Sequence, residues 1–162
     1  MKPLHTACLL LSAFFLQTTA VKLTVIGGAG PNLLLCSALV LVVKAREPAP
    51  VIGLCVLTAV LQELCFSLYA GPAPAAMFTA CITTAFAGNF LALEHPLFLA
   101  GLTVVQTLLY NGVLWGVSAI LGAPYDFLYV LRIQPVYILY NLVLMALFYF
   151  LFLNKTEGRY SR

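Results

Sequence analysis

Long apolar runs alternate with short polar, proline-containing or glycine-containing breaks along almost the whole chain. Each run is apolar on every side instead of alternating with polar residues, which favours membrane helices over membrane strands. A helix of about 20 residues is long enough to cross a bilayer. The pattern predicts six helical spans, at residues 4–21, 31–43, 51–69, 75–91, 97–121 and 135–153, with a polar tail at 154–162.

The breaks between the runs carry residues that end and start helices. Residues 27–31 contain three glycines and a proline, and residues 44–50 contain three charges and two prolines. Because proline has no backbone N–H, it suits the first turn of a helix, and Pro31 and Pro135 are placed at such starts. The second run is short, so we expect its helix to be tilted or shielded by its neighbours. The first run also has the features of a signal peptide, but we favour an uncleaved span because all later runs are equally apolar.

Composition supports a membrane location for the whole chain. Of the 162 residues, 63% are hydrophobic and 8% are charged, whereas a soluble domain is about 45–50% apolar and about 25% charged. This composition excludes a soluble enzyme, a disordered regulator and a nucleic-acid-binding protein. Six spans would leave about 40 residues for all connections and ends. We therefore expect one all-α integral membrane domain over residues 1–162, a polytopic bundle of about six helices.

The basic residues are distributed unequally between the two predicted sides of the membrane. With the N-terminus inside, the inner side holds Lys2, Lys44, Arg46, Lys155, Arg159 and Arg162, and the outer side holds Lys22 and Arg132. Lys and Arg are enriched on the cytoplasmic side of membrane proteins. The distribution predicts that both ends of the chain lie in the cytoplasm.

Glu63 follows Gln62 within the third predicted span. A carboxylate at mid-helix costs about 2.5–3.5 kcal/mol on insertion scales, whereas each leucine contributes only about 0.3–0.6 kcal/mol in favour of insertion. Glu63 must therefore face protein or water, and burial favours its neutral form. We expect a neutral Glu63 that donates a hydrogen bond to a neighbouring helix. The functional alternative is a proton or ligand site.

Other candidate contacts between helices are amides and glycines. Gln106, Asn111 and Asn141 lie at membrane depth, where amides usually join helices. Gly112 and Gly116 form a GxxxG motif that lets a second helix approach closely, and that helix can belong to this chain or to a partner. The sequence has no Ser–His–Asp set, no HExxH motif, no Walker loop and no C-x-x-C pair. We expect no enzymatic activity, no cofactor and no metal site.

Three short motifs follow one another in a characteristic order. Pro31-Asn32-Leu33-Leu34-Leu35 follows a glycine-proline break, Gln62-Glu63-Leu64 precedes a Gly-Pro turn, and Pro135-Val136-Tyr137-Ile138-Leu139-Tyr140-Asn141 lies in the last span. In this order and spacing the chain resembles the MreD family of bacterial rod shape-determining membrane proteins. The family typically has aspartate where this chain has Asn32, and often where it has Glu63.

The resemblance implies a non-enzymatic role in the cell-wall elongation machinery of the bacterial cytoplasmic (inner) membrane. The implied partner is MreC, together with the glycosyltransferase RodA and a class B penicillin-binding transpeptidase, and indirectly the MreB filament. The fold of this family is also similar to the substrate-binding subunits of energy-coupling-factor transporters. The alternative function is therefore the binding of a small, vitamin-like solute. Short outer loops with few polar groups favour the scaffold function over solute binding.

The predicted topology can be tested by fusing a reporter that is active only in the periplasm after Arg162. We expect the fusion to be inactive, because the excess of basic residues keeps this end inside. A fusion after Arg132, on the predicted outer side, is the matched positive control. Activity of the Arg162 fusion would require an odd number of spans or the inverted orientation.

Overall fold

The computed structural model describes residues 3–19, 25, 28–67, 70–90, 95–122 and 126–153. Their regular structure is helical, which confirms the predicted all-α class. The helices in order are α1 (Pro3–Thr19), α2 (Leu33–Lys44), α3 (Pro48–Phe66), α4 (Pro72–Ala87), α5 (Pro96–Ile120) and α6 (Phe127–Phe148), which continues as a π-helical segment, Tyr149–Leu153.

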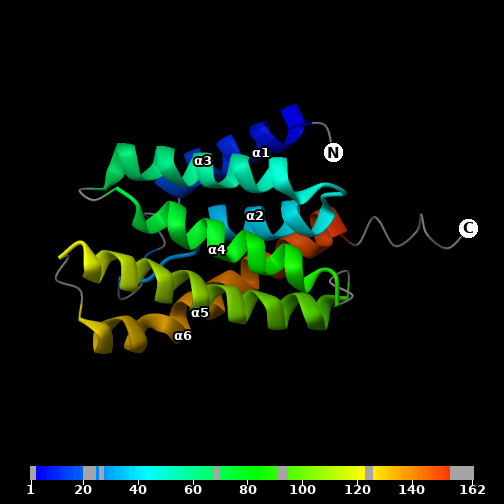
Figure 1. Cartoon of the computed structure of the whole chain (residues 1–162). Coiled ribbons are helices and arrows are strands. Elements are labelled where there is room, and N and C mark those ends of the chain that lie inside the picture. The colour runs from blue at the N-terminus through cyan, green and yellow to red at the C-terminus, as the bar shows by residue number, and fades with distance from the viewer. Residues whose placement is uncertain are drawn as a thin grey trace, which may run out of the picture.

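Successive helices run in alternating directions and lie side by side (Figure 1). One end of the bundle holds the starts of α1, α3 and α5, together with Lys44 and Arg46, and is called the basic end here. The opposite end holds the starts of α2, α4 and α6. Arg132, in the second turn of α6, lies toward the opposite end. The other basic residues of the sequence, and the expected tail at 154–162, lie outside the described residues.

Helix α2 is the centre of the bundle. It packs against α1, α3, α4 and α6, and every residue from Leu34 to Val42 is buried. Its 12 residues give a length of about 18 Å, well below the roughly 30 Å of a bilayer's hydrocarbon core. The expectation that the second helix is shielded by its neighbours is confirmed.

The outer helices present apolar surface. Within the described ranges, α3, α5 and α6 with its extension are long and apolar enough to cross a membrane. Large apolar side chains point outward, including Leu64 (70% exposed), Leu97 (72%) and Ile120 (86%). Contiguous apolar surface of this kind is rare on soluble proteins and suits contact with lipid tails. The helices and the composition together indicate a membrane protein.

Several expected helix boundaries differ from the structure: α4, for example, spans Pro72–Ala87 and not 75–91. Two of the differences change the position of candidate residues. The last helix begins at Phe127, not at Pro135, because Asp126 caps it by accepting a hydrogen bond from the N–H of Leu128 (3.1 Å). Pro135 lies inside α6 with its side chain exposed, and proline inside a membrane helix is tolerated where neighbouring groups satisfy the backbone. The third helix ends at Phe66, so Glu63 lies in its last turn, not deep within it.

The central position of α2 predicts a large effect of truncating its side chains. Leu39 is fully buried, and Leu39→Ala should lower the free energy of unfolding by about 2–5 kcal/mol because it leaves a cavity. Leu57→Ala on α3, where the side chain is 54% exposed, is the matched control and should change stability little. Thermal unfolding of the purified protein in detergent measures both. Equal losses would contradict the central placement of α2.

Candidate functional site

Side chains from other helices accept hydrogen bonds from the backbone N–H groups at the start of α2. The N–H of Asn32 donates to Oδ1 of Asn141 on α6 (2.9 Å), and the N–H of Leu33 donates to Oε1 of Gln17 on α1 (2.7 Å). The N–H of Leu35 donates to Oδ1 of Asn32 itself (3.0 Å). The first N–H groups of a helix have no partner within the helix, and lipid supplies no water to satisfy them. These contacts therefore allow α2 to begin inside the bundle.

Asn141 connects three helices. Its side chain is 1% exposed, and its Nδ2 donates to the hydroxyl of Thr107 on α5 (3.1 Å). Its backbone carbonyl accepts a hydrogen bond from Sγ of Cys36 on α2 (3.7 Å). Asn141 thus ties α6 to both α2 and α5 at membrane depth.

Glu63 plays the corresponding part at the start of α4. Its two carboxylate oxygens accept hydrogen bonds from the N–H groups of Gly71 and Ala73, and Pro72 between them has no N–H. The prediction that Glu63 donates to a neighbouring helix is therefore wrong. Because α3 ends at Phe66, the chain can turn back and place the positive end of the α4 dipole against the carboxylate. Both oxygens of the Glu63 side chain thus act as acceptors for the first N–H groups of α4.

The other two predicted amides also bridge helices. Gln106, 2% exposed, forms a hydrogen bond through Nε2 with the hydroxyl of Thr83 on α4 (2.9 Å). Asn111 donates through Nδ2 to Oε1 of Gln134 on α6 (3.0 Å). Gln134 was not among the sequence candidates, because the expected boundary at Pro135 placed it in a loop. Gln134 is in fact buried within α6. With the helix correctly begun at Phe127, it would have counted as a polar residue inside a membrane helix.

A polar cleft opens at the opposite end of the bundle, beside the start of α2. It has a volume of about 300 Å³, and its lining includes the amides and phenols of Gln17, Asn32, Gln62, Tyr110, Asn111 and Tyr137. A second cavity of about 210 Å³, with Glu63, Ser67 and Ser118 in its wall, shares Gln62 and Tyr110 with the first. Polar groups inside a membrane protein are costly, so their convergence here is a candidate binding site.

The three short motifs at residues 31–35, 62–64 and 135–141 converge at this cleft. Asn32 belongs to the first motif, Gln62 to the second and Tyr137 to the third, and all three residues line the same cavity. Asn141, at the end of the third motif, holds the start of the first. Segments separated by about 30 and about 70 residues in the sequence therefore form one structural unit.

Gly112 and Gly116 lie on an outward-facing strip of α5. A Cβ placed on either glycine would meet no heavy atom of the described residues within 4 Å. Val105 (59% exposed) and Leu108 (46% exposed) continue the same face. No described helix of this chain therefore packs against the GxxxG motif, which leaves this face open to lipid or to a partner helix.

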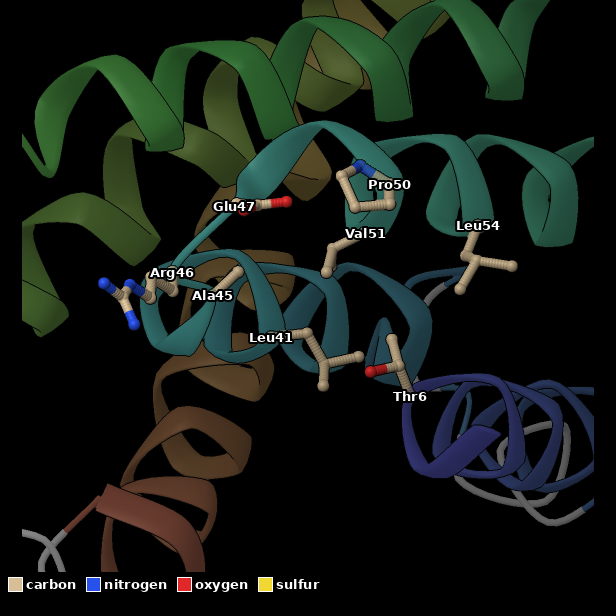
Figure 2. A pocket seen from close by; sticks show the side chains of 8 residues that line it. All are labelled: Thr6, Leu41, Ala45, Arg46, Glu47, Pro50, Val51 and Leu54. Atoms are coloured by element: carbon tan, nitrogen blue, oxygen red, sulfur yellow. The ribbon is translucent and has the colours of Figure 1, made fainter. Parts of the chain in front are cut away.

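A separate pocket of about 310 Å³ lies at the basic end, among α1, α2 and α3. Figure 2 shows Thr6, Leu41, Val51 and Leu54 around it, with Arg46 and Glu47 toward the α2–α3 connection. This pocket was not expected from the sequence, because its walls come from ordinary apolar residues of three helices.

The described residues contain no group of three or more His, Cys, Asp or Glu side chains that could hold a metal ion. The five cysteines are free, and Cys36, Cys55 and Cys81 are buried.

No protein-family model matches the chain, and neither a curated protein nor a solved structure matches it.

The contacts of Glu63 predict that replacing it with glutamine destabilises the fold. Glu63→Gln should lower the free energy of unfolding by about 1–3 kcal/mol, because the amide NH₂ would face a backbone N–H and leave it without an acceptor. Glu47→Gln is the matched control, since the exposed Glu47 side chain makes no capping hydrogen bond at the start of α3. Thermal unfolding in detergent compares the two. A silent Glu63→Gln would contradict the capping role.

Proposed function

We propose that this protein is an MreD-like, non-enzymatic membrane scaffold of the cell-wall elongation machinery. The observation that carries the proposal is the open face of α5, where Gly112 and Gly116 lie without a partner helix from the described part of the chain. Association of helices in lipid depends on close packing and not on hydrophobic burial, because lipid tails are as apolar as leucine. A glycine face on a long outer helix is suited to such packing.

The dimensions of α5 fit this use. Its 25 residues give a length of about 37 Å, enough to cross the roughly 30 Å of hydrocarbon. A partner helix could therefore lie along it through the full depth of the bilayer. The proposed partner is MreC, with RodA and the class B penicillin-binding transpeptidase in the same assembly and the MreB filament connected indirectly.

The proposed topology has six passes of the bacterial cytoplasmic membrane with both ends in the cytoplasm. The described basic residues support it, since Lys44 and Arg46 lie at one end of the bundle and Arg132 lies toward the other. The short α2 and the 16-residue α4 would pass through the membrane shielded by longer helices. The convergence of the three motifs at one cleft supports the likeness to MreD.

A second candidate function is the binding of a small solute, and the polar cleft favours it. Several helices contribute amides and phenols to one cavity of about 300 Å³, the lower limit of typical ligand pockets. Gln62, Asn111 and Tyr137 offer both donors and acceptors without a net charge. The fitting ligand is an uncharged polar molecule, in agreement with a vitamin-like solute.

The scaffold proposal predicts that filling the glycine face disrupts partner capture. Gly112→Leu/Gly116→Leu should keep the helices inserted, because leucine favours insertion, but should reduce co-purification of MreC from native membranes about tenfold or more. Gly53→Leu is the matched control, since Gly53 on α3 is also exposed with no neighbour within 4 Å. The source cells should become rounded with the double variant and stay rod-shaped with Gly53→Leu. Full recovery of MreC would exclude this face as the docking site.

The solute-binding candidate predicts a different phenotype. Gln62→Leu should weaken binding of an uncharged vitamin, such as riboflavin or pyridoxine, by about two- to tenfold, the effect of losing one hydrogen bond. Ligand-dependent thermal shifts of the purified protein measure this, with Gly53→Leu again as control. If cells without the protein keep their normal shape and the vitamin binds in the cleft, the scaffold function is excluded and solute binding is favoured.

A further inference from the structure

The pocket at the basic end combines an apolar interior with a charged rim. Leu41 on α2 and Val51 and Leu54 on α3 form its apolar wall, and α1 closes it with Thr6. From Glu47 to Leu54 the wall extends along seven residues of α3 and its N-cap, about 10 Å. The pocket thus runs from one end of the bundle toward its apolar middle.

The rim carries two opposite charges, Arg46 and Glu47, that form no ion pair with other described residues. Arg46 and Glu47 are adjacent, both are exposed, and Glu47 makes no capping hydrogen bond to α3. Figure 2 shows the Arg46 guanidinium extending away from the apolar residues, while the Glu47 carboxylate points back along α3. Within the described ranges the two side chains form no ion pair with each other. Both residues line the pocket, so a ligand there can reach Glu47 directly and Arg46 when its long side chain turns toward the pocket.

We propose that this pocket binds a phospholipid with a zwitterionic ethanolamine headgroup. One acyl chain lies against Leu41, Val51 and Leu54, the phosphate contacts Arg46, and the ammonium contacts Glu47. A guanidinium matches a phosphate because its N–H groups donate in a planar fork. A primary ammonium donates charge-assisted hydrogen bonds to a carboxylate.

Other common headgroups match the rim less well. A choline headgroup keeps the positive charge but has no N–H to donate to Glu47. A glycerol headgroup has no positive charge to pair with Glu47, so its phosphate at Arg46 would lie beside an unpaired carboxylate. The proposal does not depend on the scaffold function, because its residues belong to α1–α3 and the α2–α3 connection, whereas the glycine face is on α5.

A lipid in this position would also join helices. α1 packs against α2 and α3, and the pocket lies among these three helices. An acyl chain there would fill the space between α1 and the α2–α3 pair. The bound lipid would thereby hold the first helix against the rest of the bundle.

Native mass spectrometry of the full chain in detergent tests the proposal with three probes: phosphatidylethanolamine, phosphatidylcholine and phosphatidylglycerol with identical acyl chains. We expect wild-type protein to retain the ethanolamine lipid about threefold or more above either of the others, the upper range for an exposed ion pair. Arg46→Gln should lower retention of all three lipids. Glu47→Gln should lower retention of the ethanolamine lipid and raise that of the glycerol lipid, so that the preference disappears.

Two further variants separate this pocket from general lipid adhesion. Val51→Phe fills the pocket without changing charge and should reduce retention of all three lipids. Arg132→Gln removes an exposed arginine of α6 away from the pocket and should leave the preference unchanged. Equal retention of the three lipids by wild-type protein would overturn the proposal. A preference that persists in both Arg46→Gln and Glu47→Gln, or that Arg132→Gln abolishes, would also overturn it.

Discussion

The first backbone N–H groups of α2 have no acceptor within their own helix and need acceptors from other parts of the chain. Asn141 supplies one acceptor from α6, and Gln17 supplies another from α1. Without them, the central helix would begin with part-buried N–H groups that have no acceptor from the protein. Because α2 packs against four other helices, its position determines where those helices meet.

The same requirement explains the chemistry of the opposite end of the bundle. Glu63 satisfies the start of α4 as Asn141 and Gln17 satisfy the start of α2. The acceptors for both short helices therefore come from neighbouring elements, and polar residues collect at this end. The polar cleft is bordered by these groups, with Gln17, Asn32 and Gln62 in its wall. Gln17 and Asn32 therefore both accept hydrogen bonds from the start of α2 and line the candidate binding site. The open face of α5 is separate from both features.

The sequence predicted the helices well because long apolar runs and their breaks are local features. It placed Glu63, Asn141 and the GxxxG motif among the important positions for sound reasons, since buried polar groups and paired glycines are informative in a membrane helix.

The sequence could not give the partners of these residues. Glu63 accepts from residues eight and ten positions later, and this depends on where α3 ends. The predicted start of α6 is wrong because Pro135 does not begin the helix, and Asp126 caps it nine residues earlier. The pocket at the basic end has no sequence signal, because it exists only where three helices leave a space.

Hydrogen–deuterium exchange at the start of α2 is the most direct test of the central claim. We expect the amides of Asn32, Leu33 and Leu35 in the detergent-purified protein to exchange slowly, because each donates to a side-chain acceptor. Asn141→Leu should accelerate exchange there, because Asn32 loses its acceptor. Asn111→Leu, which removes an amide bonded to Gln134 and not to a backbone N–H, should leave exchange at these residues unchanged. Fast exchange in the wild-type protein, or equal acceleration by the two variants, would contradict the dependence of α2 on Asn141.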